Sequence, residues 1–355
     1  MSSKLKLGVI GTGNIFRGAH LPVWLGHSEV EIVALCDVAM DKAQAIANQH
    51  GISHVYNDYK EMLANEQLDI VDICTSNAYH AQAAICAIEA GAHVLCEKPD
   101  ATNSADAEAM AAASIRHDRI LMAIRNNRFT STSSFLRKYV DAGHMGDIYT
   151  GRCGWIRRRG IPGKGGWFTT KELSGGGPLI DLGVHFIDLA MWLMGNPKPV
   201  AVSGATYCKF AESSLSDSIH SQFGEKNSEG TFDVEDLATG FVRFDNGATL
   251  QIEFSWASNI EEEMNFLELR GTKAGFSLRN GDAKLFTEIE ETLCMVVPQL
   301  KKQADFGHAS QINHFIDVVR KRSQPIVTPE QGVDMIKLLA GIYESARLGR
   351  EIQLT

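Results

Sequence analysis

The chain has 355 residues, 44% of them hydrophobic and 22% charged, which suits two globular domains and excludes a disordered or fibrous protein. A formal net charge of −9 disfavours a nucleic-acid partner, which would need a basic surface. No apolar run is long enough to span a bilayer, and no leader pattern precedes the first apolar segment. The seven cysteines lack ligand-like spacing. We therefore predict a cytoplasmic protein with reduced thiols, no metal, no membrane association and no nucleic-acid partner.

The first part of the chain alternates short apolar runs with helical patterns, which predicts a parallel α/β sheet. The expected strands are 5–10, 31–36, 70–74, 93–96 and 120–124, and the expected helices are 41–50, 59–65, 78–90 and 104–117. We assign residues 1–126 to the first domain.

A glycine-containing turn follows the first predicted strand, with the sequence Gly11-Thr-Gly13-Asn-Ile-Phe16. Such a turn lets the backbone approach a pyrophosphate, which then lies at the positive end of the next helix. The third position of the fingerprint is Phe16 rather than glycine or alanine, and a similar turn can join any strand to a helix. Asp37, which ends the second predicted strand, favours NAD over NADP because a carboxylate accepts hydrogen bonds from the ribose 2′-hydroxyl and repels a 2′-phosphate. Alternatively, Asp37 caps a helix.

The tripeptide Glu97-Lys98-Pro99 follows the predicted strand 93–96. Parallel α/β sheets bind their ligands at the carboxyl ends of the strands, so Lys98 is expected at the cofactor edge. Its ammonium group there would stabilise the alkoxide that develops on a substrate hydroxyl while the carbon bearing that hydroxyl loses hydride. The alternative is an ordinary surface lysine in a strand-to-helix turn.

A second polar group lies in the stretch Gly175–Asp188, where Pro178 suits the start of a helix. Asp181 and His185 are four residues apart and therefore share one helix face, which Asp188 continues. A carboxylate beside an imidazole fixes its tautomer and raises its basicity, which suits a general base. The alternatives are a metal site formed by the three side chains and a hydrogen-bonded histidine in the core.

The pattern changes after residue 126. We expect helices at 133–142, about 178–194, 311–321 and 329–348, and strands at 148–159, 200–210, 237–244, 248–256, 266–271 and 274–278. Asp245-Asn-Gly247 predicts a hairpin between two of these strands, and the polar segment 211–233 predicts a long surface loop.

Several residues in or beside the predicted elements are candidates for substrate binding. Arginine side chains offer paired donors for sugar hydroxyls or carboxylates, and an indole can stack on a sugar ring. Because strand residues alternate between faces, at least one of Arg157 and Arg159 should face the substrate cleft, and parity alone does not identify which. The alternative is a solvated charge run, to which Arg152 and Arg158 also belong. The full substrate-binding prediction is Lys98, Arg125, Asn127, Arg157, Arg159, Trp167, Asp181 and His185.

These motifs, together with Thr75-Ser-Asn77-Ala-Tyr-His80, occur in the order seen in the glucose–fructose oxidoreductase/inositol dehydrogenase/MocA (Gfo/Idh/MocA) family, which the chain resembles over nearly its whole length. The resemblance implies an α/β protein: an N-terminal Rossmann fold (1–126) and a C-terminal substrate-binding and oligomerisation domain (127–355) with a large, mostly antiparallel sheet. It implies that Lys98, Asp181 and His185 are catalytic and that the Lys98–Pro99 bond is often cis. The implied cofactor-binding residues are Gly11, Thr12, Gly13, Asn14, Ile15, Asp37, Thr75, Ser76, Asn77, His80, Glu97, Lys98 and Arg128.

The predicted function is reversible, NAD-dependent oxidation of a secondary hydroxyl of a sugar, cyclitol or sugar derivative to a ketone. Two alternatives use the same fold. One is glycoside cleavage by transient oxidation and elimination on bound NAD, and the other is a non-catalytic sensor, which would not need Lys98 and His185 together. The resemblance also implies a homo-oligomer, a dimer or tetramer, formed through the exposed face of the second sheet.

Overall fold

The computed structural model describes residues 3–216, 218–300 and 307–354. The chain divides into two compact units, one formed by the residues up to Ile124 with 308–336 and the other by 125–307 with the residues from Lys337 on. No helix within the described residues is long and apolar enough to cross a membrane.

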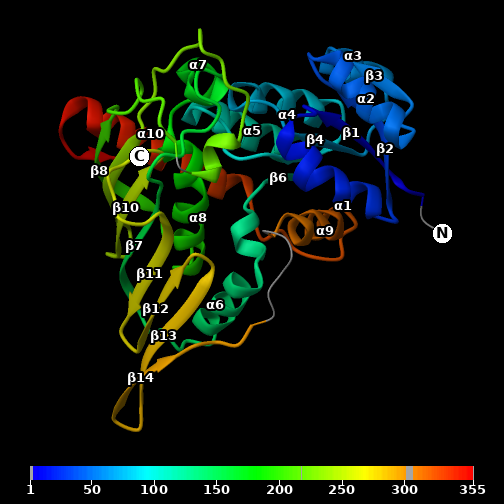
Figure 1. Cartoon of the computed structure of the whole chain (residues 1–355). Coiled ribbons are helices and arrows are strands. Elements are labelled where there is room, and N and C mark those ends of the chain that lie inside the picture. Colours follow the sequence, from blue (N-terminus) through cyan, green and yellow to red (C-terminus); the bar gives the residue numbers. More distant parts are fainter. Residues whose placement is uncertain (1–2, 217, 301–306, 355) are drawn as a thin grey trace. The chain divides into compact units, whose positions relative to one another are not determined.

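The first unit is a Rossmann fold, as predicted, and Figure 1 shows it mainly in blue and cyan. Its six strands all pair in parallel, in the order β3-β2-β1-β4-β5-β6. The strands are β1 (Leu5–Ile10), β2 (Val30–Cys36), β3 (His54–Tyr56), β4 (Ile70–Ile73), β5 (His93–Cys96) and β6 (Leu121–Ala123). The helices are α1 (Leu21–Gly26), α2 (Met40–His50), α3 (Tyr59–Asn65), α4 (His80–Glu89) and α5 (Ser104–His117), with a π-helical turn at Phe16–His20 and a 3-10 turn at Asn77–Tyr79.

Local capping explains where these helices begin and end. The side chain of Asn103 accepts a hydrogen bond from the Asp106 amide at the start of α5, and Gly51 ends α2 in the left-handed conformation. The sequence pattern did not predict β3, since this edge strand has three residues and none of them is buried.

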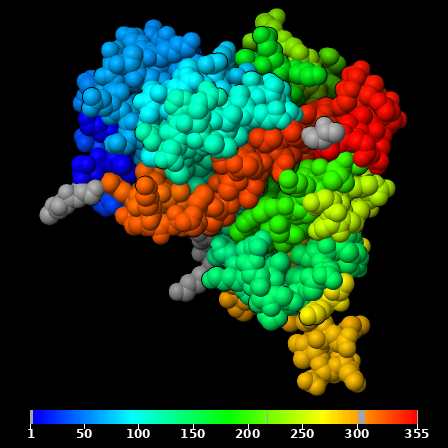
Figure 2. Space-filling view, turned by 180° about the vertical axis from the view of Figure 1, so that it is seen from behind, coloured from blue at the N-terminus to red at the C-terminus, as the bar shows by residue number. Residues whose placement is uncertain are grey.

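The sequence predicted one boundary between the two domains, at residue 126. The observed units differ from this division because α9 (His308–Val319) packs with the first unit. The helix buries Ile312, Phe315 and Ile316, and Gln311 Nε2 donates to the carbonyl oxygen of Ala123 at 2.8 Å. Figure 2 shows the orange surface of this segment beside the blue and cyan surface of the same unit. An amphipathic pattern predicts that a helix has a buried face but does not say which domain covers it.

The second unit contains the predicted large sheet, nine strands in the order β14-β13-β12-β11-β7-β10-β9-β8-β15. All neighbours are antiparallel except β7 and β10. The strands are β7 (Ile148–Ile156), β8 (Pro199–Tyr207), β9 (Leu237–Phe244), β10 (Thr249–Ser255), β11 (Met264–Gly271), β12 (Ala274–Arg279), β13 (Asp282–Ile289), β14 (Thr292–Val296) and β15 (Ile352–Gln353). The helices are α6 (Ser131–Asp141), α7 (Lys171–Ser174) and α8 (Val184–Leu193), with further short turns at Asn126–Phe129, Trp167–Thr169, Leu179–Gly183 and Ile219–Gln222; α10 (Pro329–Leu348) ends in this unit.

The two faces of this sheet differ in character. Leu250, Ile252 and Phe254 of β10 are buried, and α8 packs against β7 and β11 on the covered side. The intervening Gln251 is exposed and Glu253 is half-buried, so the other face is more open. The predicted hairpin at 245–247 joins β9 to β10.

A buried cluster of charged side chains holds α8 through its residue Asp188. Asp188 accepts hydrogen bonds from Arg125 Nε at 2.9 Å and from Arg128 Nε and Nη2 at 2.7 and 2.6 Å. All three side chains are almost fully buried. Because each charge offsets the desolvation of the others, removing one partner would leave an uncompensated buried charge.

We predict that Asp188→Ala lowers the free energy of unfolding of the full chain by about 3–5 kcal/mol, measured by urea denaturation, because two buried guanidinium groups lose their carboxylate. The control is Asp141→Ala, which removes the exposed partner of Arg137 and should cost at most about 1 kcal/mol. Equal losses in the two variants would contradict this account of the cluster.

Candidate functional site

The glycine turn after β1 has the conformation that close approach to a diphosphate requires. Gly11 has a φ of +93°, and a Cβ there would lie 2.6 Å from the backbone carbon of Cys74. A Cβ at Gly13 would meet no atom within 4 Å, so the backbone is open on that side. Helical conformation begins at Asn14, which leaves the first amides of the helix for an anion. Phe16 is fully buried, so the side chain at the third fingerprint position belongs to the core and does not obstruct the turn.

Asp37 directly follows β2 and connects the second strand to the glycine turn. Its Oδ2 accepts hydrogen bonds from the amide and hydroxyl of Thr12 at 2.7 and 2.8 Å, and its Oδ1 accepts one from the Ala39 amide at 2.9 Å. The N-cap of α2 is Ala39, so Asp37 is not the cap of that helix. The half-buried carboxylate is therefore held beside the turn, where a ribose hydroxyl would need an acceptor.

The segment from Thr75 to His80 follows β4 at the same edge of the sheet. Thr75 and Ser76 are half-buried, whereas Asn77 and His80 are buried. His80 Nδ1 lies 2.7 Å from the carbonyl oxygen of Pro99, and Nε2 lies 3.1 Å from that of Thr75. Burial lowers the pKa of His80. The imidazole therefore joins the loops that follow β4 and β5.

The loop after β5 carries Glu97, Lys98 and Pro99. The Lys98–Pro99 peptide is cis, as the resemblance implied. Lys98 is half-buried, and its amide donates to Oε2 of the buried Glu97 at 3.0 Å. Burial opposes ionisation of Glu97, but the hydrogen bond and charge of His20 outweigh it and lower the pKa of Glu97 to about 2.

In the second unit, Asp181 lies in the π-helical turn before α8 and His185 lies in its first turn. Both are half-buried, whereas their predicted companion Asp188 is buried with two arginines instead of extending a metal-ligand set. Trp256 Nε1 donates to Asp181 Oδ2 at 3.0 Å. This bond orients the carboxylate without neutralising it.

A buried carboxylate that sequence reasoning missed, Glu235, holds the start of this helical segment. It accepts hydrogen bonds from the amides of Gly177 and Leu179 at 2.9 and 3.1 Å and from the hydroxyl of Tyr343 at 2.9 Å. Burial raises the pKa of Glu235, although these donors oppose the shift. Its sequence signal, an acid beside an apolar strand, was too weak to separate it from a surface residue.

Aromatic and cationic side chains accompany Asp181 and His185. The ring of Trp155 lies 6.3 Å from that of His185 and 5.8 Å from that of His220, and the Arg157 guanidinium lies 4.8 Å from the Trp155 ring. Arg157 is only 6% exposed, and its Nε is buried with no hydrogen-bond partner among the described residues. Burial lowers the pKa of Arg157 to about 10, with the charge of Asp181 opposing, so the group stays cationic at neutral pH. A buried donor of this kind can donate a hydrogen bond to a polar ligand.

The other predicted substrate residues lie in different surroundings within this unit. Arg159 stacks on Phe210 at 4.1 Å and donates to the carbonyl oxygen of Ser258 and to Asn259. Trp167 is half-buried and stacks on Phe168 at 3.8 Å. Asn127 is half-buried, while its neighbours Arg125 and Arg128 bind Asp188. Trp155, His220 and Trp256 were missed, because an isolated aromatic residue or histidine carries no spacing signal.

Comparisons with known proteins agree with this architecture. Residues 5–124 match the model of the oxidoreductase family with an NAD-binding Rossmann fold, and residues 134–277 match the GFO/IDH/MocA C-terminal domain. The chain is 35% identical to the D-glucoside 3-dehydrogenase of Escherichia coli (strain K12), over 99% of this chain and 98% of that protein. It is 31% identical to a putative UDP-kanosamine synthase oxidoreductase subunit of Amycolatopsis mediterranei (strain S699), over 78% and 75%.

Among solved structures, GenD2 from gentamicin A biosynthesis in complex with NAD superposes with a TM-score of 0.80 at 25% identity, covering 100% of this chain and 97% of that one. The two family matches together cover most of the chain, and the relatives match both units. The chain therefore belongs to the Gfo/Idh/MocA oxidoreductase family and is a dehydrogenase with an NAD-binding Rossmann domain.

Proposed function

We propose that this protein reversibly oxidises a secondary hydroxyl of a sugar, cyclitol or sugar derivative to a ketone, with NAD as the hydride acceptor. The observation that carries the proposal is the group formed by Asp181, His185, Arg157 and Trp155. It combines a carboxylate–imidazole pair with a buried cation and an indole, which suits proton removal from a polyhydroxylated ring. The glucoside dehydrogenase of E. coli, matched over the full length, supports this substrate class.

The residues around the glycine turn fit NAD. The backbone at Gly11 and Gly13 would accommodate the diphosphate, and the Asp37 carboxylate would accept hydrogen bonds from the adenosine ribose while repelling a 2′-phosphate. Further contacts would come from Thr12, Asn14, Ile15, Thr75, Ser76, Asn77 and Lys98, whereas the buried Glu97 and His80 would support the loops that carry them. When bound, NAD supplies the two-electron acceptor that takes hydride from the substrate carbon.

The chain's own residues handle the proton and the developing charge. His185 removes the hydroxyl proton, and Asp181, oriented by Trp256, stabilises the imidazolium that results. Lys98 stabilises the alkoxide through its ammonium group. The C–H bond breaks with its electron pair, and the C–O bond becomes a carbonyl, so two electrons leave the substrate and one proton stays on His185.

Arg157 is the better of the two arginine candidates for substrate contact. It is buried beside Trp155 with one donor unsatisfied, whereas Arg159 already donates to Ser258 and Asn259. We propose that Arg157 donates to a substrate hydroxyl or ring oxygen and that Trp155 contacts the sugar ring.

We predict that His185→Ala and Lys98→Ala each lower kcat by about 10²–10⁴-fold, because each removes a group that acts on the reacting hydroxyl. The assay is NADH formation at 340 nm with NAD and a panel of glucosides and inositols. Lys171→Ala, which changes an exposed lysine at the start of α7, is the matched control and should retain normal turnover.

Normal turnover in the His185→Ala variant would remove the proposed base. Release of an aglycone without net NADH would instead support glycoside cleavage by transient oxidation and would contradict simple dehydrogenation.

We predict that the wild-type protein prefers NAD to NADP and that Asp37→Asn raises the NADP-to-NAD ratio of kcat/KM by about tenfold, since the amide no longer repels a 2′-phosphate. Asp41→Asn, in the exposed first turn of α2, should leave the ratio unchanged. An unaltered ratio in Asp37→Asn would mean that Asp37 serves only the hydrogen bonds to Thr12 and Ala39.

We also propose that the protein forms a homo-oligomer through the open face of the nine-stranded sheet. Phe286 of β13 is 44% exposed and pairs with Met295 of β14, which is 60% exposed, while Tyr149 nearby is also exposed. Exposed apolar groups gathered on one sheet face are typical of a protein interface.

Light scattering should therefore give the mass of a dimer or tetramer, and Met295→Glu should lower it by placing a charge in the apolar contact. The control is Leu215→Glu. Leu215 is also an exposed apolar residue, at 77%, but it lies in the loop after β8, so this change should not alter the mass. A monomeric wild-type protein would contradict the proposal.

A further inference from the structure

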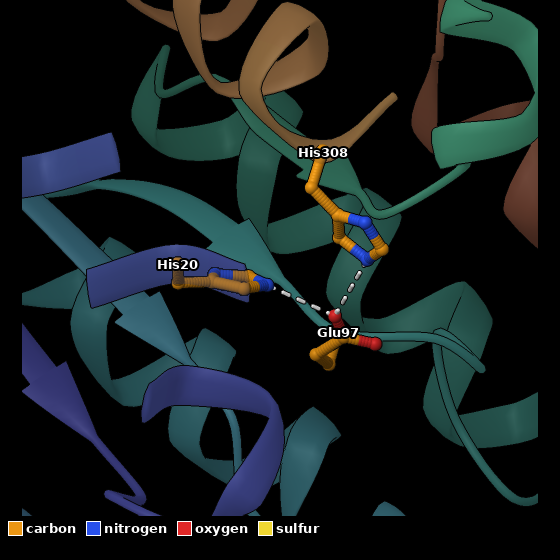
Figure 3. A group of neighbouring side chains, drawn as sticks. All are labelled: His20, Glu97 and His308. Atoms are coloured by element: carbon orange, nitrogen blue, oxygen red, sulfur yellow. Dashed lines mark hydrogen bonds and ion pairs between the residues drawn. The ribbon is translucent and has the colours of Figure 1, made fainter. Parts of the chain in front are cut away.

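A buried network of charged side chains lies beneath the cofactor edge of the Rossmann unit. His20, the last residue of the π-helical turn, has no exposed surface. Its Nδ1 lies 2.9 Å from Asp72 Oδ2, and its Nε2 lies 3.0 Å from Glu97 Oε1. Figure 3 shows the His20 ring pointing at Glu97, with His308 of α9 near the same oxygen. His308 Nε2 lies 4.0 Å from Glu97 Oε1.

Two carboxylates on opposite sides of one imidazole require a proton on each ring nitrogen. A neutral ring would direct a lone pair at one of the two anions, so the hydrogen-bond pattern fits the imidazolium. Burial lowers the pKa of His20, but the charge of Asp72 and its hydrogen bond outweigh that effect, with Cys74 contributing in the same direction, and the pKa is raised well above its usual value. The result is a buried cation between Asp72 and Glu97.

Each carboxylate also accepts a second hydrogen bond. Asp72, on β4, accepts a hydrogen bond from Trp24 Nε1 at 2.6 Å, which fixes the position of its carboxylate. Glu97 uses its other oxygen, Oε2, to accept the backbone amide of Lys98 at 3.0 Å. A continuous chain of hydrogen bonds therefore runs from Trp24 through the imidazolium to the peptide that carries Lys98.

The proposed function needs Lys98 at a defined position, because alkoxide stabilisation depends on where the ammonium lies. We infer that His20 is a positioning residue for hydride transfer: its imidazolium holds Glu97, Glu97 holds the Lys98 amide, and Lys98 is thereby aligned with the reacting hydroxyl. The inference rests on the proposed role of Lys98. His20 itself is buried and acts through Glu97.

The shape of histidine allows the two sides of the network to be tested separately. The amide nitrogen of asparagine occupies the place of Nδ1, and that of glutamine the place of Nε2. His20→Asn thus keeps a donor to Asp72 and loses the one to Glu97, whereas His20→Gln keeps the donor to Glu97. Both variants lose one hydrogen bond and the buried cation, so their melting temperatures should fall together.

We expect His20→Asn to lower kcat at least about tenfold and His20→Gln to lower it less than about threefold, with the Kd for NADH, measured by fluorescence, nearly constant in both. In a Lys98→Ala background, His20→Asn should cause no further loss, because the effect passes through Lys98. His54→Asn changes an exposed histidine that pairs with the half-buried Glu66, and it is the control that should leave kcat and Kd unaltered.

Three results would overturn the inference. If the two His20 variants lost equal amounts of kcat, in proportion to their fall in melting temperature, the role of His20 would be structural. A full additional loss of kcat in the Lys98→Ala background would show that His20 does not act through Lys98. Stoichiometric zinc in the purified protein, with activity lost on chelation, would show that His20, Glu97 and His308 hold a metal instead. If Lys98→Ala alone retained full turnover, the proposed function would fail independently of His20.

Discussion

Parallel pairing of the six strands in the first unit places all their carboxyl ends on one edge, and the arrangement of the cofactor-side residues depends on this constraint. Gly11 follows β1, Asp37 follows β2, Thr75 follows β4 and Glu97 follows β5. Thr12 is buried and Lys98 is half-buried, so side chains must satisfy those backbone amides in the turns that water does not reach. Asp37 does so for Thr12, and Glu97 does so for Lys98. The same hydrogen bonds that stabilise the edge thus give it a definite shape for a ligand.

In the second unit, the charged residues that support the fold differ from the candidate catalytic residues in burial and in pairing. Asp188 is buried and held by two arginines, and Glu235 is buried and receives three donors. Asp181 and His185 lie on the same helical segment but are half-buried. A fully compensated buried charge can support the fold but has little capacity to bind a ligand, whereas a half-buried pair can exchange a proton. This contrast supports Asp181 and His185 as the reactive pair.

The sequence predicted those parts of the fold that depend on local pattern. Strand 5–10 and helices 59–65 and 104–117 were predicted to the residue, since alternating apolar runs and capping residues mark them directly. The cluster of Arg125, Arg128 and Asp188 and the network around His20 were not predicted, because their partners lie about 50 to 80 residues apart and only the tertiary fold brings them together. The same limit left Arg157 and Arg159 indistinguishable until their neighbours were known.

The proposed function depends on hydride transfer from a ring carbon of the substrate to NAD. The most direct measurement uses a glucoside deuterated at the carbon that is oxidised and follows the label by mass spectrometry in a single turnover. Direct hydride transfer predicts one deuterium in the reduced nicotinamide for each ketone formed, with none released to water. Ketone formation with the label in solvent, or with an unlabelled nicotinamide, would contradict it.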